Sequence, residues 1–124
     1  MDMINTYRAS MFDGTAEIDW LRQGWRGLRY YGRQAKAAIE AGDNVAKMAV
    51  IARADELLDL LSGILETGAN ATLGPAMMTI YTALRFTLLR ANAENSLDAL
   101  RDYEAALALL DRDMTKSSES VPAT

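Results

Sequence analysis

Three segments of the chain repeat their apolar residues at alternating intervals of three and four, and this repeat constrains the fold most strongly. Its members are Ile18, Leu21, Trp25, Leu28, Gly32, Ala35 and Ile39; then Met77, Tyr81, Leu84, Leu88 and Ala91; and finally Leu100, Tyr103, Leu107, Leu110 and Met114. This spacing places side chains on one stripe of an α-helix. The repeat therefore predicts amphipathic helices that pack together as a bundle.

Turn and capping residues divide the chain into four predicted helices. The first begins at Asp13-Gly14-Thr15 and ends near Ala41, and Gly42-Asp43 then ends it and caps a second helix over 44–67. The third covers 77–95, with Pro75 in its first turn and Thr72 as its cap. Asn95 or Ser96 caps the fourth.

No segment shows a β-pattern, so the predicted fold class is all-α, an antiparallel four-helix bundle with a short N-terminal arm. The arm comprises residues 1–14, the bundle residues 15–115, and residues 116–124 form a polar tail predicted to be disordered. The arm either docks on the bundle as a short helix or is a frayed terminus.

Composition excludes several classes of function. The 124 residues contain neither cysteine nor histidine, which rules out thiolate chemistry, Ser-His-Asp sites and the usual metal ligands. A net charge of −4 argues against a nucleic-acid partner. We expect no cofactor and no metal. The first residues lack the features of a signal peptide, and no apolar run approaches the roughly 20 residues that span a bilayer. A cytoplasmic protein without membrane insertion is expected.

The third predicted helix carries more apolar residues than one buried stripe requires. A second line, Met78, Thr82, Phe86 and Leu89, lies on a different side of this helix. Either the helix is central to the bundle, or this line contacts a partner. In the second helix, Met48 and Leu60 also fall outside the core stripe. Seven methionines suit an adaptable binding surface.

The first predicted helix carries two further lines beside its core stripe. One contains Trp20, Gly24, Gly27 and Tyr31, and its glycines indicate that another backbone approaches closely. The other contains Arg22, Arg26, Arg29, Arg33 and Lys36, which form either an anionic docking strip or, as we favour, a solvated face. A solvated face is also the favoured interpretation of Asp55, Glu56 and Asp59, which lack the glycine turn of a calcium loop.

Three hypotheses for function remain open on these patterns. The first is a binding module whose grooves receive amphipathic helices. The second is a small helical enzyme of the chorismate-mutase type, which needs several cations in an apolar pocket. The basic line of the first helix opposes its core stripe and argues against such a pocket. The third is a structural or dimerising bundle.

Several motifs, in order and spacing, resemble those of the flagellar export chaperones that hold flagellin before type III secretion. They are Trp25-Arg26-Gly27, Ala38-Ile39-Glu40-Ala41-Gly42-Asp43, Ile80-Tyr81, Leu88-Leu89-Arg90-Ala91-Asn92-Ala93-Glu94-Asn95 and Leu97-Asp98. Tyr7 matches a tyrosine of the family's N-terminal arm. The resemblance covers about residues 4–114. This chain departs from the family at Phe86, where a basic residue is usual.

The resemblance implies a non-enzymatic chaperone that wraps the disordered C-terminal region of flagellin around its bundle and blocks premature polymerisation. A component of the export gate is a further expected partner, and a homodimer is compatible with the sequence. Combined with the apolar lines, the resemblance designates Tyr7, Met48, Leu60, Met78, Tyr81, Phe86 and Leu89 as candidate partner-binding residues.

Overall fold

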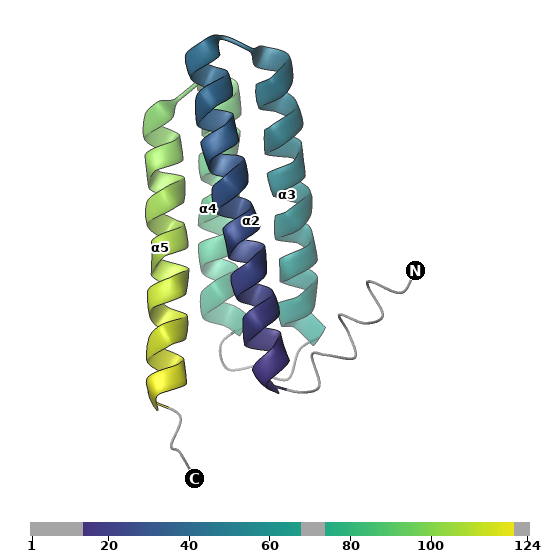
Figure 1. Cartoon of the computed structure of the whole chain (residues 1–124), viewed down its shortest axis with the longest axis vertical. Helices are drawn as coiled ribbons and strands as arrows, with labels where there is room; N and C mark the ends of the chain where they lie inside the picture. The colour runs from purple at the N-terminus through teal and green to yellow at the C-terminus, as the bar shows by residue number, and fades with distance from the viewer. Residues whose placement is uncertain (1–13, 68–73, 121–124) are drawn as a thin grey trace.

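The computed structural model describes the backbone of residues 14–67 and 74–120, and the side chains of residues 19–63 and 75–112. Within these ranges the chain forms four α-helices and no strand: α2 (Gly14–Ala41), α3 (Asn44–Thr67), α4 (Gly74–Glu94) and α5 (Leu97–Ser120). Successive helices run in opposite directions (Figure 1). The predicted all-α antiparallel four-helix bundle is confirmed.

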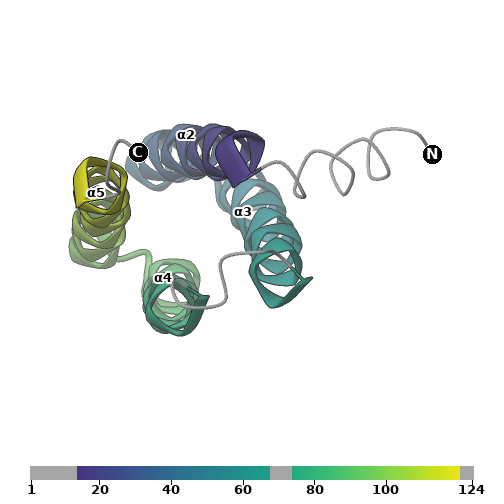
Figure 2. The ribbon, with the colours of Figure 1, turned by 90° about the horizontal axis from the view of Figure 1, so that it is seen from below.

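The four helices form a ring in which each packs against two neighbours (Figure 2). The adjacent pairs are α2 with α3, α3 with α4, α4 with α5, and α5 with α2. The ring encloses the core, which contains the described members of the predicted stripes. These buried residues are Leu21, Trp25, Leu28, Ala35, Ile51, Ala54, Leu58, Leu61, Met77, Tyr81, Leu84, Leu88, Ala91, Ala99, Leu100, Tyr103, Leu107 and Leu110.

The two described connections are tight because their capping residues satisfy the helix ends. Gly42 has a φ of 68°, which a glycine adopts without strain, and the Asp43 amide donates to the Ala38 carbonyl at 2.9 Å. The Asp43 side chain then accepts from the Ala46 amide at 3.1 Å. Ser96 accepts from the Ala99 amide at 3.1 Å and so caps α5. The predicted caps at Asp43 and Ser96 are present, and the predicted cap Thr72 lies outside the described residues.

Two glycines of α2 lie where α3 packs closely against this helix. A Cβ at Gly24 would lie 2.5 Å from Leu61 Cδ2, and one at Gly27 would lie 3.0 Å from Leu57 Cδ2. Leucine side chains of α3, rather than backbone atoms, lie nearest to these two glycines in the close contact between α2 and α3. The spacing of Gly24 and Gly27 indicates that another element packs closely against α2. It does not reveal which atoms of that element make the contact.

The last helix is longer than predicted, because α5 continues to Ser120 and includes the first residues of the expected disordered tail. The segment from Lys116 to Ser120 contains neither proline nor glycine, so nothing in it blocks a helix. Residues 121–124 and the predicted arm before residue 14 lie outside the described residues. None of the described helices is long and apolar enough to cross a membrane.

Candidate partner-binding groove

Most of the exposed large apolar side chains in the described part of the chain lie on two adjacent helices, α3 and α4. In the described part of the chain, seven large apolar side chains are exposed, and α3 and α4 carry five of them: Val45, Met48, Leu60, Phe86 and Leu89. The other two, Tyr30 and Leu109, lie apart on α2 and α5. Single exposed apolar residues are ordinary on a protein surface, whereas a cluster marks a candidate interaction site.

Two facing stripes define what we call the α3–α4 groove. On α3 the stripe is Val45, Met48, Ala52, Asp55, Asp59 and Ser62; on α4 it is Met78, Thr82, Arg85, Leu89 and Asn92. Both stripes use the alternating spacing of three and four that keeps residues on one side of a helix. Because the helices are antiparallel, the apolar start of the α3 stripe lies beside the end of the α4 stripe, and its polar end lies beside Met78 and Thr82.

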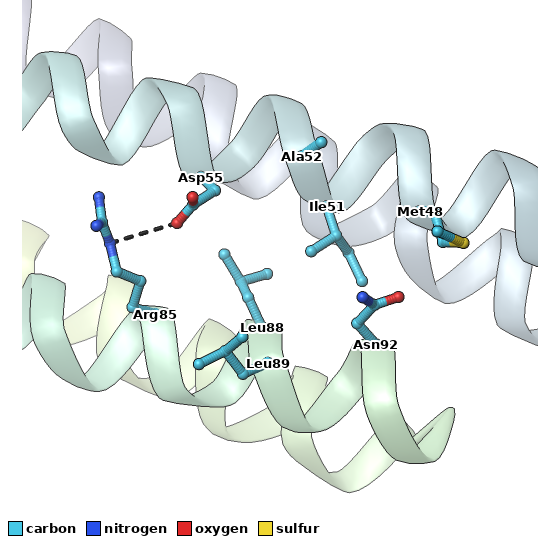
Figure 3. A pocket seen from close by; sticks show the side chains of 8 residues that line it. All are labelled: Met48, Ile51, Ala52, Asp55, Arg85, Leu88, Leu89 and Asn92. Carbon is cyan, nitrogen blue, oxygen red and sulfur yellow. Dashed lines mark ion pairs between the residues drawn. The ribbon is translucent and has the colours of Figure 1, made fainter.

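The larger of two hollows in this groove has a volume of about 410 Å³. Figure 3 shows Leu88 and Leu89 of α4 across from Asp55 and Ile51 of α3, with Met48 and Asn92 at the other end of the hollow. The full lining is Met48, Ile51, Ala52, Asp55, Arg85, Leu88, Leu89 and Asn92. Carbon atoms dominate this surface, with polar groups at its two ends. Its shape and chemistry suit an apolar side chain supplied from outside.

The smaller hollow, of about 230 Å³, lies further along the same groove. Its lining is Asp59, Ser62, Met78, Tyr81, Thr82 and Arg85. Hydroxyl groups and a carboxylate make this hollow more polar than the larger one. Arg85 lines both hollows and separates them.

An ion-pair cluster, which we call the Arg85 bridge, crosses the groove between the hollows. Arg85 Nε lies 3.3 Å from Asp55 Oδ1, and its terminal nitrogen donates to the Asp59 carboxylate. The hydrogen bond to Asp59 is the main reason why the pKa of Arg85 is raised; partial burial lowers it, and the charges of Asp55 and Asp59 raise it further. All three side chains are partly exposed, so the bridge contributes little to stability.

A buried lysine holds the end of α4 beside the larger hollow. Lys47 Nζ donates to the Asn92 carbonyl at 2.9 Å and to Asn95 Oδ1 at 2.6 Å. The carbonyl lies in the last turn of α4, where no helical amide remains to satisfy it. Asn95 follows the helix with a φ of 50°, a conformation that asparagine tolerates better than most residues. Lys47 therefore positions the Asn92 wall of the groove.

The predicted partner-binding residues separate into distinct locations. Met48, 58% exposed, and Leu89, 63% exposed, line the larger hollow. Met78 is half-buried and lines the smaller one. Leu60, 42% exposed, and Phe86, 62% exposed, line neither hollow.

Tyr7 and Tyr81 are the two remaining predicted partner-binding residues. Tyr7 lies outside the described residues. Tyr81 is only 2% exposed and packs in the core, and it also lines the smaller hollow. Its role in partner binding stays a prediction. Its hydroxyl accepts a hydrogen bond from Trp25 Nε1 at 3.0 Å, across the bundle from α4 to α2. Burial raises the pKa of Tyr81 to about 12, while the Trp25 hydrogen bond lowers it.

Sequence reasoning missed Val45, Asp55, Arg85 and Asn92 as parts of this surface. The signal was present, because these residues continue the spacing of three and four past the apolar members of each stripe. An apolar repeat alone does not predict Asp55, Arg85 and Asn92, because the groove changes from apolar to charged along its length. Val45 is apolar but was not assigned to this surface.

The described residues contain no group of acidic side chains that could hold a metal ion. Lys47 is the single buried charged side chain among them, and its two acceptors belong to the protein. The exposed cations of α2, among them Arg26, Arg33 and Lys36, do not enter the core. The several inward cations that a chorismate-mutase-type site needs are therefore not found in this part of the chain.

Comparison with known proteins gives one finding. No curated protein and no solved structure matched the chain. The family model described as flagellar protein FliS matches residues 20–113, which span α2, α3, α4 and most of α5. The match covers well over half of the 124 residues and agrees with the helical fold. The chain therefore belongs to the family of the flagellar protein FliS.

Proposed function

We propose that this protein is a cytoplasmic, non-enzymatic chaperone that binds the C-terminal region of flagellin along the α3–α4 groove. Binding keeps flagellin from polymerising and delivers it to the flagellar export apparatus, where a gate component is a second partner. Membership of the FliS family supports a flagellar chaperone role. The observation that carries the proposed site is the gathering of Met48 and Leu89, both largely exposed, at one hollow.

The physical basis is folding of the cargo on binding. A disordered segment loses conformational freedom when it becomes a helix, and burial of its apolar side chains offsets that loss. The larger hollow supplies apolar walls from both α3 and α4. Methionine at its edge adapts to the shape of the entering side chain. Without a partner, the described groove is exposed to solvent. A bound helix would therefore bury apolar surface there.

The test is titration of the full chain with a peptide of the flagellin C-terminal region from the same organism. Circular dichroism should show a gain of helix beyond the sum of the separate components, and calorimetry should show heat of binding. Leu89→Asp should weaken binding by roughly 30-fold or more, as expected for an anchor at the centre of an interface. The absence of both a helix gain and heat would reject the proposal.

Leu109→Asp is the matched control, since it places the same substitution at an exposed leucine of α5. This variant should bind the peptide within about twofold of the wild type, because a substitution outside an interface changes affinity little. Phe86→Asp tests the outer face of α4 and should have a smaller effect than Leu89→Asp. Equal loss of binding in the Leu89 and Leu109 variants would exclude the α3–α4 groove as the site.

The alternative hypothesis, a dimerising bundle, predicts a different result for the same wild-type protein and Leu89→Asp variant. If two copies bury this groove against each other, sedimentation should show a dimer that Leu89→Asp converts to a monomer. A monomeric wild type that binds the peptide is the expected outcome.

A further inference from the structure

We propose that the α3–α4 groove selects its helical partner by register and by charge. A large apolar side chain of the partner enters the larger hollow, and a small side chain two turns away enters the smaller one. Between them the partner places a hydrogen-bond donor, lysine, arginine, asparagine or glutamine, against the Arg85 bridge. This inference rests on the proposed function and specifies the chemistry of the segment that the groove accepts.

The register follows from the positions of the two hollows along α4. The smaller hollow is bordered on α4 by Met78, Tyr81, Thr82 and Arg85, and the larger by Arg85, Leu88, Leu89 and Asn92. Each α4 residue of the larger hollow lies seven positions after a residue of the smaller hollow. On an α-helix this displacement is roughly 10 Å along the axis. A partner helix lying in the groove matches it with side chains at i and i+7, which share one face of that helix.

The lining of each hollow sets which side chain enters it. The larger, about 410 Å³, is walled by Ile51, Leu88 and Leu89 and suits leucine, methionine or phenylalanine. The smaller, about 230 Å³, is lined by Ser62 and Thr82 with a half-buried methionine, and it suits alanine, valine or threonine. A large apolar side chain there would bury hydroxyl and carboxylate oxygens without partners, which is unfavourable.

The charge preference follows from the composition of the Arg85 bridge. One guanidinium faces two carboxylates, Asp55 and Asp59, one turn apart on α3. Each ionised carboxylate accepts several hydrogen bonds, and one arginine leaves acceptor sites open on both. The bridge therefore carries an excess negative charge at the middle of the groove. A donor from the partner complements this charge, whereas a glutamate or aspartate there is repelled.

The bridge lies where a partner residue midway between the two anchors would pass. On the partner helix, positions i+3 and i+4 share the face that carries i and i+7. Arg85 lines both hollows, so it marks the midpoint of the groove in the structure itself. Figure 3 shows its guanidinium directed toward Asp55 at one end of the larger hollow. One position of the partner sequence is therefore predicted to carry the charge preference.

The test uses synthetic amphipathic helical peptides with leucine and alanine at i and i+7. One peptide carries lysine at i+4 and its matched peptide carries glutamate there. Wild-type protein should bind the lysine peptide about tenfold more tightly than the glutamate peptide, a difference typical of one well-placed charge contact. A third peptide with the anchors at i and i+4 should bind about tenfold more weakly than the first, because it cannot fill both hollows.

The double variant Asp55→Asn, Asp59→Asn separates charge from shape. It removes the excess negative charge and frees Arg85, so its preference should reverse in favour of the glutamate peptide. These ion pairs are partly exposed, so the variant should fold with almost unchanged stability, as circular dichroism will verify.

Failure of this inference is distinguishable from failure of the proposed function. If the flagellin peptide binds and is sensitive to Leu89→Asp, but the lysine and glutamate peptides bind alike or not at all, the selection rule is wrong and the chaperone proposal stands. Equal binding of the peptide with shifted anchors also overturns the register. If the flagellin peptide itself does not bind, the proposed function fails first.

Discussion

Two opposite interfaces of the same bundle, α2 with α5 and α3 with α4, differ in how they meet the solvent. Between α2 and α5, the ring of Tyr103 packs against Gly32, and the Tyr103 hydroxyl donates to the Leu28 carbonyl at 2.6 Å. An ion pair of Arg29 with Asp111 lies at the edge of this interface. Between α3 and α4, two hollows remain, and apolar side chains at the larger one are exposed. We call the first interface the α2–α5 seam.

The difference shows that exposure depends on whether the facing helix supplies a complementary group. In the α2–α5 seam, the absence of a side chain at Gly32 makes room for an aromatic ring, which then finds a backbone acceptor on α2. In the α3–α4 groove, Leu89 faces no comparable group and lies 63% exposed. A hollow between α2 and α5 is lined by Arg29, Arg33, Glu104 and Ala108, so it is charged and offers little to an apolar partner.

The largest expected effect comes from a comparison of one residue in the α2–α5 seam with one residue in the α3–α4 groove. Tyr103→Ala should lower the free energy of unfolding by about 3–5 kcal/mol, because it leaves a cavity and removes the buried hydrogen bond to the Leu28 carbonyl. Leu89→Ala should change it by less than about 0.5 kcal/mol, as is usual at an exposed position. Urea denaturation followed by circular dichroism measures both. Similar losses for the two variants would remove the distinction between a packed residue of the α2–α5 seam and an exposed residue of the α3–α4 groove.

Alkaline pH should act on buried tyrosines rather than on the groove. The pKa of Tyr81 is raised from 10.0 to about 12, and burial also raises the pKa of Tyr103. A folded-state pKa above the unfolded value means that this stabilisation is complete below pH 10 and is lost as the pH rises toward 12. Tyr81 alone should remove on the order of 2–3 kcal/mol of unfolding free energy across that range.

The measurement is the urea midpoint at intervals from pH 8 upward, with Tyr81→Phe in parallel. The phenylalanine variant is less stable at neutral pH because Trp25 loses its acceptor, and its stability should decline less steeply above pH 10. Identical slopes for wild type and variant would show that Tyr81 does not control the decline.

A substitution at Lys47 tests whether the hydrogen bonds of this residue maintain the shape of the α3–α4 groove. Lys47→Met keeps most of the buried chain length but removes the hydrogen bonds to Asn92 and Asn95, at a cost of about 1–3 kcal/mol. Amide exchange should then quicken at the end of α4 and leave the α2–α5 seam unchanged. Lys36→Met, at an exposed position, is the control and should have almost no effect.

The smallest effects come from two glycine substitutions of opposite sign. Gly32→Ala should destabilise the protein by about 1 kcal/mol net, because the new Cβ would lie 2.8 Å from Tyr103 Cε1, outweighing the better helix propensity. Gly63→Ala meets nothing within 4 Å and should stabilise α3 by about 0.5–1 kcal/mol. Stabilisation by both substitutions would mean that the α2–α5 seam is less tightly packed than the distances indicate.

Periodicity predicted the fold because burial in a helical bundle repeats with the helix. The stripe that contains Tyr81, Leu84 and Leu88 is buried along its described length, and the caps at Asp43 and Ser96 are where the sequence placed them. The candidate site was predicted less completely. Met48 and Leu89 were identified as apolar residues outside the core stripes, whereas Arg85 and Asn92 were not identified at all.

The sequence by itself therefore determined the four described helices, their core faces, the described turns and the surplus of apolar side chains. Those properties depend on local geometry, which every helix expresses through its own spacing of residues. Only the tertiary structure decided which surplus residues are covered. Gly24 receives Leu61 and Gly32 receives Tyr103, while Leu89 receives nothing of comparable size. Such fits depend on the register between two helices, and neither helix contains that information alone.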